Sequence, residues 1–322
     1  MRKSTFSIKL FVLGCLAIGY FDSSAQDKSV KTNGITIAYE SFGKKNKETI
    51  ILIQGTGAPM TDWPVELCQK LVHNGYRVIR FDNRDSGKST HLDSLGQPDW
   101  AKIGPFVTTC NPAQLPYTIR DMCTDVIGLM DALKINKAHI AGVSMGGAIA
   151  QLIAVDYPKR VYTLTSIAAT SGNPSLPWGN ESTLKALGTP PPSNNNIDSI
   201  TNYLVFINKS LGSTDNDQTL RKEALQHIHR SWYPEGTARQ AAAILITDRC
   251  DRRAELAKIK LPVMVIHGDD DPLVPLIAGE DVAKSIANSE LRIIKGMGHH
   301  ISMKFIDELG DDIVENAKRV HQ

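Results

Sequence analysis

Residues 139–157 read HIAGVSMGGAIAQLIAVDY and join a short apolar strand, a glycine-flanked serine and an alanine-rich helix that Pro158 ends. Gly142 and Gly146 lie two positions to either side of Ser144, where small residues are needed because strand and helix crowd together at such a turn. A serine centred in this strand–turn–helix pattern indicates a nucleophile. The alternative, a glycine-rich turn that only packs tightly, leaves the centred serine unexplained.

Strands and helices alternate on both sides of this stretch, which predicts a mostly parallel sheet covered by helices. Residues 49–54, TIILIQ, are almost entirely β-branched or apolar, as in a strand buried on both faces. Asp62 is expected to cap the helix that follows it. The predicted strands are 35–40, 49–54, 76–82, 139–143, 161–168, 261–268 and 291–294, and the predicted helices are 62–73, 119–133, 146–157, 277–288 and 305–320.

The alternation stops over residues 171–259, which carry polar helices and loops rich in proline and asparagine, such as GTPPPSNN at 188–195. Regular order returns after residue 260. We interpret 171–259, called the cap segment below, as a helical lid inserted over the edge of the sheet. The main α/β domain then consists of 26–170 and 260–322.

The composition is that of a folded globular chain, with 322 residues of which 42% are hydrophobic and 22% charged. This length is enough for one large domain with an insertion. Lys and Arg number 36 against 34 Asp and Glu, and the sequence has no long basic run. We therefore expect no nucleic-acid partner. The oligomeric state is left open.

A targeting segment precedes the globular part. Arg2, Lys3 and Lys9 are followed by the apolar run LFVLGCLAIGYF at 10–21 and by small residues at 23–25. This is the layout of a secretory signal peptide, which we place at residues 1–25. The apolar run is shorter than the about 20 residues of a spanning helix, which disfavours an uncleaved anchor.

Cys15 raises a minor alternative, a lipid-anchored form, because VLGC at 12–15 loosely resembles a lipoprotein signal. A lipid-attachment cysteine closes the apolar region, whereas residues 16–21 are still apolar. We therefore expect an exported protein, periplasmic or secreted, without stable membrane insertion after cleavage. Residues 1–25 hold three basic residues and one acidic residue, so the rest of the chain is formally neutral.

Four cysteines remain beyond the leader: Cys68, Cys110, Cys123 and Cys250. An exported protein can oxidise them in any of three full pairings. Cys68 and Cys123 lie in apolar helical patterns and are equally consistent with buried free thiols. The disulfide pairing therefore stays open. No CxxC motif or Cys–His cluster suggests a metal site.

Two further polar loops follow predicted strands. Residues 268–272, GDDDP, come directly after a buried strand, where a carboxylate can orient an imidazole; the alternative is a solvated turn whose aspartates cap the next helix. Residues 296–300, GMGHH, offer two adjacent histidines, one of which can act as a general base. The order Ser, Asp, His along the chain is that of an α/β-hydrolase triad.

With these motifs, the chain resembles the α/β-hydrolase-fold serine hydrolases over 34–171 and 260–320, and among them the esterase group that includes aclacinomycin methylesterase. The supporting strings are IQGTGAPMTDWP at 53–64, RFDNRDSGKST at 80–90, GVSMGG at 142–147, HGDDDPLVP at 267–275 and GMGHH at 296–300. The resemblance implies the α/β-hydrolase fold, with a mostly parallel eight-stranded sheet and a helical cap inserted before the acid-bearing strand.

Residue by residue, the resemblance implies Ser144 as the nucleophile. The family's Gly-x-x-Asp pattern falls on residues 268–271 and makes Asp271 the acid. The Gly-x-Gly-His pattern falls on 296–299 and makes His299 the base, with His300 as its neighbour.

The oxyanion hole that the resemblance implies uses the backbone N–H of Met145, directly after the nucleophile. Its second donor lies in Gly55-Thr56-Gly57, and we assign Thr56. The family's usual His-Gly pair is Gln54-Gly55 here, a departure that leaves the backbone donor available.

The resemblance implies hydrolysis of a carboxylic ester of a small, apolar substrate through an acyl-enzyme, without a metal or an organic cofactor. The same triad can also cleave an amide, a lactone or a C–C bond, or carry out perhydrolysis. The contrasting class is a protein whose capped pocket binds a small ligand without turnover. Serine at position 144 disfavours the haloalkane dehalogenase and epoxide hydrolase branches, which need aspartate there.

Substrate contacts are assigned to Gly55, Gly57, Trp178 and Trp232. The two tryptophans have an alternative role, packing the cap segment against the body.

Two other pairs are not assigned to the chemistry. His227 and His229 are spaced like metal ligands but lack a third ligand, so an exposed helix is the simpler interpretation. Arg84 and Asp85, in the place of the family's Asp-x-Arg-Gly motif, are assigned to the scaffold.

Overall fold

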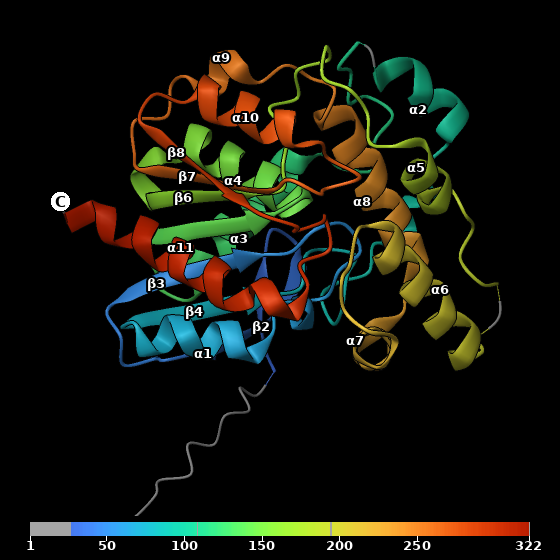
Figure 1. Cartoon of the computed structure of the whole chain (residues 1–322), viewed down its shortest axis with the longest axis horizontal. Helices are drawn as coiled ribbons and strands as arrows, with labels where there is room; N and C mark the ends of the chain where they lie inside the picture. The colour runs from blue at the N-terminus through green and yellow to red at the C-terminus, as the bar shows by residue number, and fades with distance from the viewer. Residues whose placement is uncertain (1–26, 108, 194, 322) are drawn as a thin grey trace, which may run out of the picture.

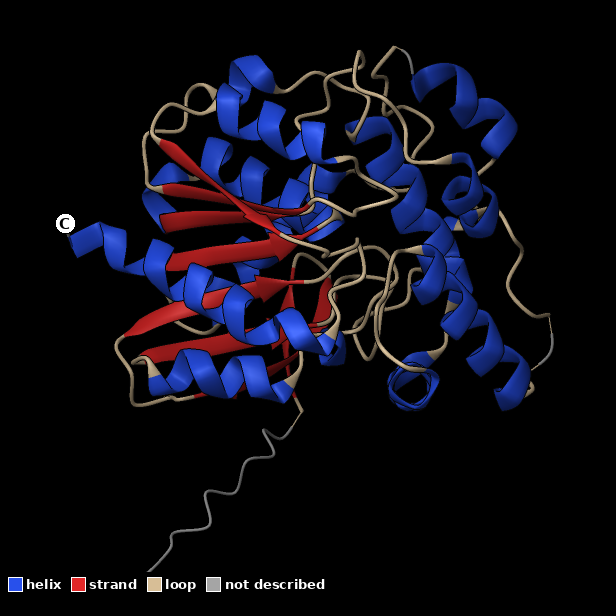
Figure 2. Ribbon diagram, in the orientation of Figure 1, coloured by secondary structure: helices blue, strands red, loops and turns tan. Residues whose placement is uncertain are grey.

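An eight-stranded sheet runs through the centre of the molecule in the order β1-β2-β4-β3-β5-β6-β7-β8 (Figures 1 and 2). The computed structural model describes residues 27–107, 109–193 and 195–321, so the predicted signal peptide at 1–25, with Cys15, lies outside the described residues. β1 and β2 pair antiparallel with their neighbours, and the other strands are parallel. The strands are β1 (Lys28–Thr32), β2 (Ile35–Phe42), β3 (Glu48–Ile53), β4 (Tyr76–Phe81), β5 (Ala138–Val143), β6 (Val161–Ile167), β7 (Val263–Gly268) and β8 (Ser289–Ile294).

Helices cover both faces of the sheet, α1 and α11 on one and α3, α4 and α10 on the other (Figure 1). The body helices are α1 (Val65–His73), α2 (Trp100–Val107), α3 (Ile119–Ala132), α4 (Met145–Asp156), α10 (Leu276–Ser285) and α11 (Ile306–Lys318). In β3, Ile50 and Leu52 belong to one core and Ile51 and Ile53 to the other. This two-sided burial explains why residues 49–54 are apolar almost throughout.

The predicted sheet is confirmed, but three local expectations need correction. Asp62 does not cap α1: it ends a short 3₁₀ turn, η1 (Met60–Asp62), and the helix begins after Pro64 without a side-chain cap. β1 was not predicted, although Asn33-Gly34, both at positive φ, form the two-residue turn that joins it to β2. Helix α2 also lies outside the predicted elements; its Ile103 is buried against α8 (Pro234–Thr247).

The helices of the cap segment are α5 (Glu181–Leu187), α6 (Ile197–Ser210), α7 (Asp217–Ser231), α8 (Pro234–Thr247) and α9 (Arg253–Leu256). Four of them, α5 to α8, lie beyond the ends of the strands toward which the arrows point in Figure 1, whereas α9 lies beside α10. The last part of the segment packs into the body, because Ala243, Leu256 and Ile259 share a core with α3 and α4. The boundaries at 171 and 259 stay a prediction. Among the described residues, no helix is long and apolar enough to cross a bilayer.

Two buried ion pairs fix the cap segment to the loop after β4. Arg239 of α8 donates to both oxygens of Asp85 at 2.8 Å, and both side chains are almost fully buried. Arg230 of α7 reaches the buried Asp82 at 2.6 Å. Arg84, which directly precedes Asp85, pairs with Asp125 of α3 at 2.6 Å. The structure thus places Arg84 and Asp85 in scaffold contacts.

In the described part of the chain one disulfide, Cys110–Cys250, joins the loop after α2 to the turn after α8, with the Cα atoms 5.4 Å apart. Cys68 and Cys123 are buried free thiols. Burial raises the pKa of both, to about 12 for Cys68, so neither thiol is ionised at neutral pH. The pairing that the sequence left open is therefore decided by the positions of these two loops.

Replacing Cys110 and Cys250 together by serine is expected to lower the free energy of unfolding by about 2–4 kcal/mol, because the cross-link restricts the unfolded chain. Urea denaturation of both proteins with and without reductant measures this. Reductant should lower the midpoint of the wild type and leave that of the double variant unchanged. Equal midpoints in all four samples would contradict the disulfide.

Candidate active site

Ser144 lies on a sharp turn between β5 and α4, with φ 55° and ψ −120°. A Cβ atom built on Gly142 would come within 2.0 Å of the carbonyl oxygen of Gly146. One built on Gly146 would come within 2.2 Å of the carbonyl oxygen of Ile53 in β3. Only glycine fits either position, and the crowding of β5, α4 and β3 holds the serine in its rare backbone conformation.

A hydrogen-bonded chain links Ser144 to the ends of two other elements. His299 Nε2 lies 3.0 Å from Ser144 Oγ, and His299 Nδ1 lies 2.8 Å from Asp271 Oδ2. A proton on Nδ1 satisfies both contacts, since Nε2 can then accept from the serine hydroxyl. Residues that are 155 positions apart in the sequence thus meet at the same edge of the sheet.

The two oxygens of Asp271 have separate partners. Oδ1 accepts the backbone N–H groups of Leu273 and Val274 at 2.9 and 2.8 Å, which leaves Oδ2 aimed at His299. Asp269 instead accepts the N–H of Gly296 at 2.6 Å. The geometry therefore brings Asp271, and not Asp269, to the histidine.

His300 contacts the cap segment. Its backbone N–H donates to Leu211 O at 3.0 Å, and its Nε2 lies 3.4 Å from Glu223 Oε2 of α7. Asp215, Glu223 and His300 bring potential metal-ligating atoms within 4.8 Å of one another. Protein groups already contact each of them, Asp215 through the N–H of Met303 at 3.2 Å. The expectation that no metal is needed stays a prediction.

Burial and charge interactions have opposite effects on the pKa of His299. Burial alone would lower the pKa of His299, but the charge and hydrogen bond of Asp271, with a further contribution from Asp248, raise it above its ordinary value. Burial would likewise raise the pKa of Asp271, but His299 and the N–H of Val274 hold it below its ordinary value. The pair therefore favours an ionised aspartate and a basic imidazole.

The loop that carries Gly55 passes directly beside the serine, since a Cβ built on Gly55 would lie 3.3 Å from Ser144 Cβ. Gly55 N–H donates to Gln54 Oε1 at 2.9 Å, and Gly57 N–H donates to Gln240 Oε1 at 2.7 Å. In the part of the chain that the structure describes, no hydrogen bond uses the N–H of Thr56.

Met145 begins α4, and the N–H groups of the first helical turn have no acceptor within the helix. Among the described residues, no other group accepts its N–H. Two free N–H groups, those of Thr56 and Met145, therefore remain on the two segments that flank Ser144.

The two assigned tryptophans have other neighbours. Trp178 is 50% exposed and lies under the Arg249 guanidinium, 4.2 Å from its ring centroid. Trp232 packs edge-on to Tyr203 of α6. No hydrogen bond or ring contact between described residues joins either tryptophan to Ser144. Their assignment to the substrate pocket stays a prediction.

His227 also has a partner in the body. Its Nδ1 lies 3.7 Å from Asp62 Oδ2, so this histidine contributes to the contact between α7 and η1.

Asp248 is a group near the site that the sequence did not indicate. It occupies the C-cap position of α8, and its negative charge contributes to the raised pKa of His299. Burial raises the pKa of Asp248 to about 6, against the opposing charge of Arg252. The position of Asp248 in a polar stretch gave no signal, because only the fold of α8 over the sheet brings it near His299.

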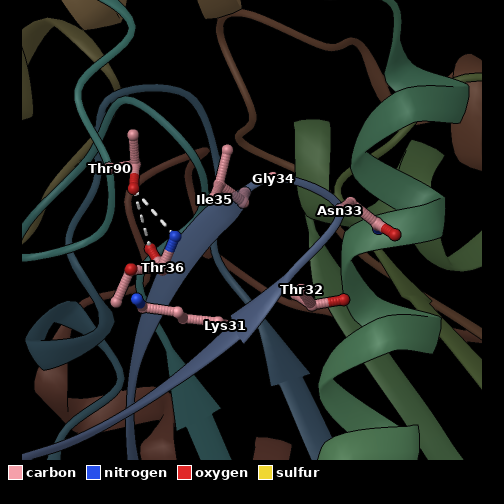
Figure 3. Close-up of a pocket in the computed structure, with 7 residues that line it drawn as sticks. All are labelled: Lys31, Thr32, Asn33, Gly34, Ile35, Thr36 and Thr90. Atoms are coloured by element: carbon pink, nitrogen blue, oxygen red, sulfur yellow. Dashed lines mark hydrogen bonds between the residues drawn. The ribbon is translucent and has the colours of Figure 1, made fainter.

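Two concave regions lie outside the hydrogen-bonded chain. An open groove of about 490 Å³ at the β1–β2 turn is lined by residues 31–36 and Thr90 (Figure 3). Thr90 Oγ1 accepts the N–H of Thr36 there at 2.8 Å. A second, of about 280 Å³, is lined by Asp270, Pro272 and parts of α5 and α6. Neither is lined by the serine, the histidine or Asp271.

Comparison with known proteins identifies the family of the chain. The family model described as alpha/beta hydrolase fold matches residues 48–305. Rhodomycin D methylesterase DauP of Streptomyces sp. (strain C5) is 25% identical, over 90% of this chain and 98% of that protein. A 2-hydroxy-6-oxononadienedioate/2-hydroxy-6-oxononatrienedioate hydrolase of Paraburkholderia xenovorans (strain LB400) is 28% identical, over 87% and 90%.

Solved structures share the fold. A meta-cleavage product hydrolase from Pseudomonas fluorescens IP01 superposes with a TM-score of 0.69 at 23% identity, covering 91% of this chain and 97% of that one. The enol-lactonase from Burkholderia xenovorans LB400 gives 0.68 at 23% identity, covering 90% and 99%. With the family match over most of its length, the chain belongs to the α/β hydrolase family and is a hydrolase.

Proposed function

We propose that this protein is an exported serine hydrolase that cleaves a carboxylic ester of a small, apolar substrate through an acyl-enzyme on Ser144. The observation that carries the proposal is the chain of hydrogen bonds from Ser144 through His299 to Asp271, at 3.0 and 2.8 Å. The ester substrate is supported by the likeness to a rhodomycin D methylesterase along nearly the whole of both chains.

The geometry supports a two-step reaction. Ser144 Oγ attacks the ester carbonyl while His299 Nε2 takes the hydroxyl proton, and Asp271 stabilises the resulting imidazolium. The N–H groups of Thr56 and Met145 hold the negative oxygen of the tetrahedral intermediate. The intermediate collapses, the alcohol leaves with the proton from His299, and the acyl group stays on Ser144.

Water completes the cycle. His299 takes a proton from the water molecule that attacks the acyl carbonyl, and a second oxyanion forms in the same place. Its collapse releases the carboxylic acid, and Ser144 regains its proton from His299. No step draws on a group outside these residues.

Export is supported by two independent features. The leader at 1–25 has the layout of a signal peptide. The Cys110–Cys250 disulfide suits an oxidising compartment such as the periplasm or the extracellular space.

Replacing Ser144 by alanine is expected to abolish turnover of short-chain p-nitrophenyl esters, because the nucleophile is removed. The wild type should release p-nitrophenol and bind a fluorophosphonate probe covalently, and Ser144→Ala should do neither. A wild-type protein that shows neither turnover nor labelling would overturn the esterase proposal in favour of a protein that only binds its ligand.

Replacing Asp271 by asparagine is expected to lower kcat by about 10⁴-fold, since an amide favours the wrong imidazole tautomer and cannot stabilise the imidazolium. The matched control is Asp269→Asn, which removes a carboxylate two positions away that accepts the backbone N–H of Gly296. Its loss of kcat should be far smaller. Equal losses in the two variants would mean that Asp271 is not the acid.

Replacing Asp248 by asparagine is expected to move the acidic limb of the kcat/KM profile to lower pH. The Asp248 carboxylate favours the imidazolium form of His299, so its removal lowers the pKa of the base. Asp251→Asn is the control, because that carboxylate is partly exposed and pairs with Arg253. An acidic limb that stays in place in Asp248→Asn would contradict the interaction.

A further inference from the structure

Two glutamine side chains accept hydrogen bonds from the backbone N–H groups on either side of Thr56. Gln54 accepts from Gly55 within the loop itself. Gln240 accepts from Gly57 at 2.7 Å although it lies 183 positions away, on α8. The loop beside Ser144 is therefore held in part by a helix of the cap segment.

The Gln240 amide is fixed at both of its ends. Its Nε2 donates to Arg84 O at 2.6 Å, and the side chain is fully buried. This bond sets the amide orientation, because only the oxygen can then face the N–H of Gly57. The adjacent Arg239 anchors the same turn of α8 through its two bonds to Asp85.

Gly57 rests directly on α8. Its φ of +71° suits glycine, and a Cβ built on it would lie 2.6 Å from Thr237 Oγ1. Thr237 and Gln240 are three positions apart and therefore share one face of the helix. The backbone of Gly57 is thus confined by contact from Thr237 and by a hydrogen bond from Gln240.

We propose that Gln240 is a positioning residue for the oxyanion hole, holding Gly57 so that the unpaired N–H of Thr56 faces the reacting carbonyl. The inference rests on the proposed esterase function. An oxyanion donor is effective because it is already oriented when the charge develops. With Gly57 released, the neighbouring peptide can rotate, and the donor is no longer held in place.

The test replaces Gln240 by methionine, which keeps the length of the side chain but makes no hydrogen bond to Gly57. Since loss of an oxyanion donor costs about 10²–10³ in kcat, loss of its positioning should cost roughly 10- to 100-fold. KM for p-nitrophenyl butyrate should change little. An alkyl trifluoromethyl ketone forms an adduct with the serine that carries an oxyanion. Its inhibition constant should rise by the same factor by which kcat falls.

Further variants separate positioning from folding. The side chain in Gln240→Asn is too short to reach both partners, so this variant should show the same losses. It replaces Gln240→Met in the test if the methionine variant does not fold. Gln240→Glu keeps an acceptor for Gly57 and should retain more kcat than either. The control is Gln151→Met, which removes an equally buried amide that bonds Ser166 and Arg252. This variant should have a lower Tm without a selective loss of inhibition by the ketone.

The outcomes are distinguishable. An active wild type with unchanged kcat and ketone inhibition in folded Gln240→Met or Gln240→Asn would overturn the inference and leave the esterase proposal standing. A wild type without turnover or fluorophosphonate labelling would overturn both. Parallel losses of kcat and ketone affinity, with KM retained and with partial rescue by Gln240→Glu, are the expected result.

Discussion

The backbone of Ser144 has a conformation that costs a non-glycine residue about 1–3 kcal/mol. The candidate active site depends on the packing that maintains this conformation. β5 and α4 meet there at an angle that leaves no room for a side chain on Gly142 or Gly146. The same close approach brings the β3 end, with Gly55, to within contact distance of the serine. The strand order brings the loops after these strands together, because the parallel strands β3, β5, β6 and β7 end at one edge of the sheet.

That edge is completed by buried ion pairs rather than by apolar packing alone. Asp82 and Asp85 follow β4 and receive Arg230 and Arg239 from the cap segment. A buried ion pair contributes little net stability, but breaking it leaves an uncompensated charge at a cost of about 3–5 kcal/mol. Such pairs define one docked position for α7 and α8, and that position places Gln240 on the loop that passes the serine and brings the charge of Asp248 to act on the histidine.

Much of the fold could be predicted because the sheet is built from local patterns. The two-sided burial of β3 and the spacing of glycines about Ser144 are visible in a single stretch of sequence. The Asn-Gly pair that turns β1 into β2 was also visible, but the predicted sheet began only at Ile35. Helix α2, which contains Pro105, gave no comparable signal, because its formation depends on packing against α8.

The sequence by itself determined the strand–helix alternation, the sharp turn at Ser144 and the short lists of candidate acids and bases, since each of these depends on neighbours along the chain. Only the tertiary structure decided between the alternatives. It placed Asp271 rather than Asp269 on His299 and paired Cys110 with Cys250. Between the N–H groups bound by Gln54 and Gln240, it left that of Thr56 without a partner among the described residues. These choices depend on contacts between segments far apart in sequence, and a local pattern does not specify such distances.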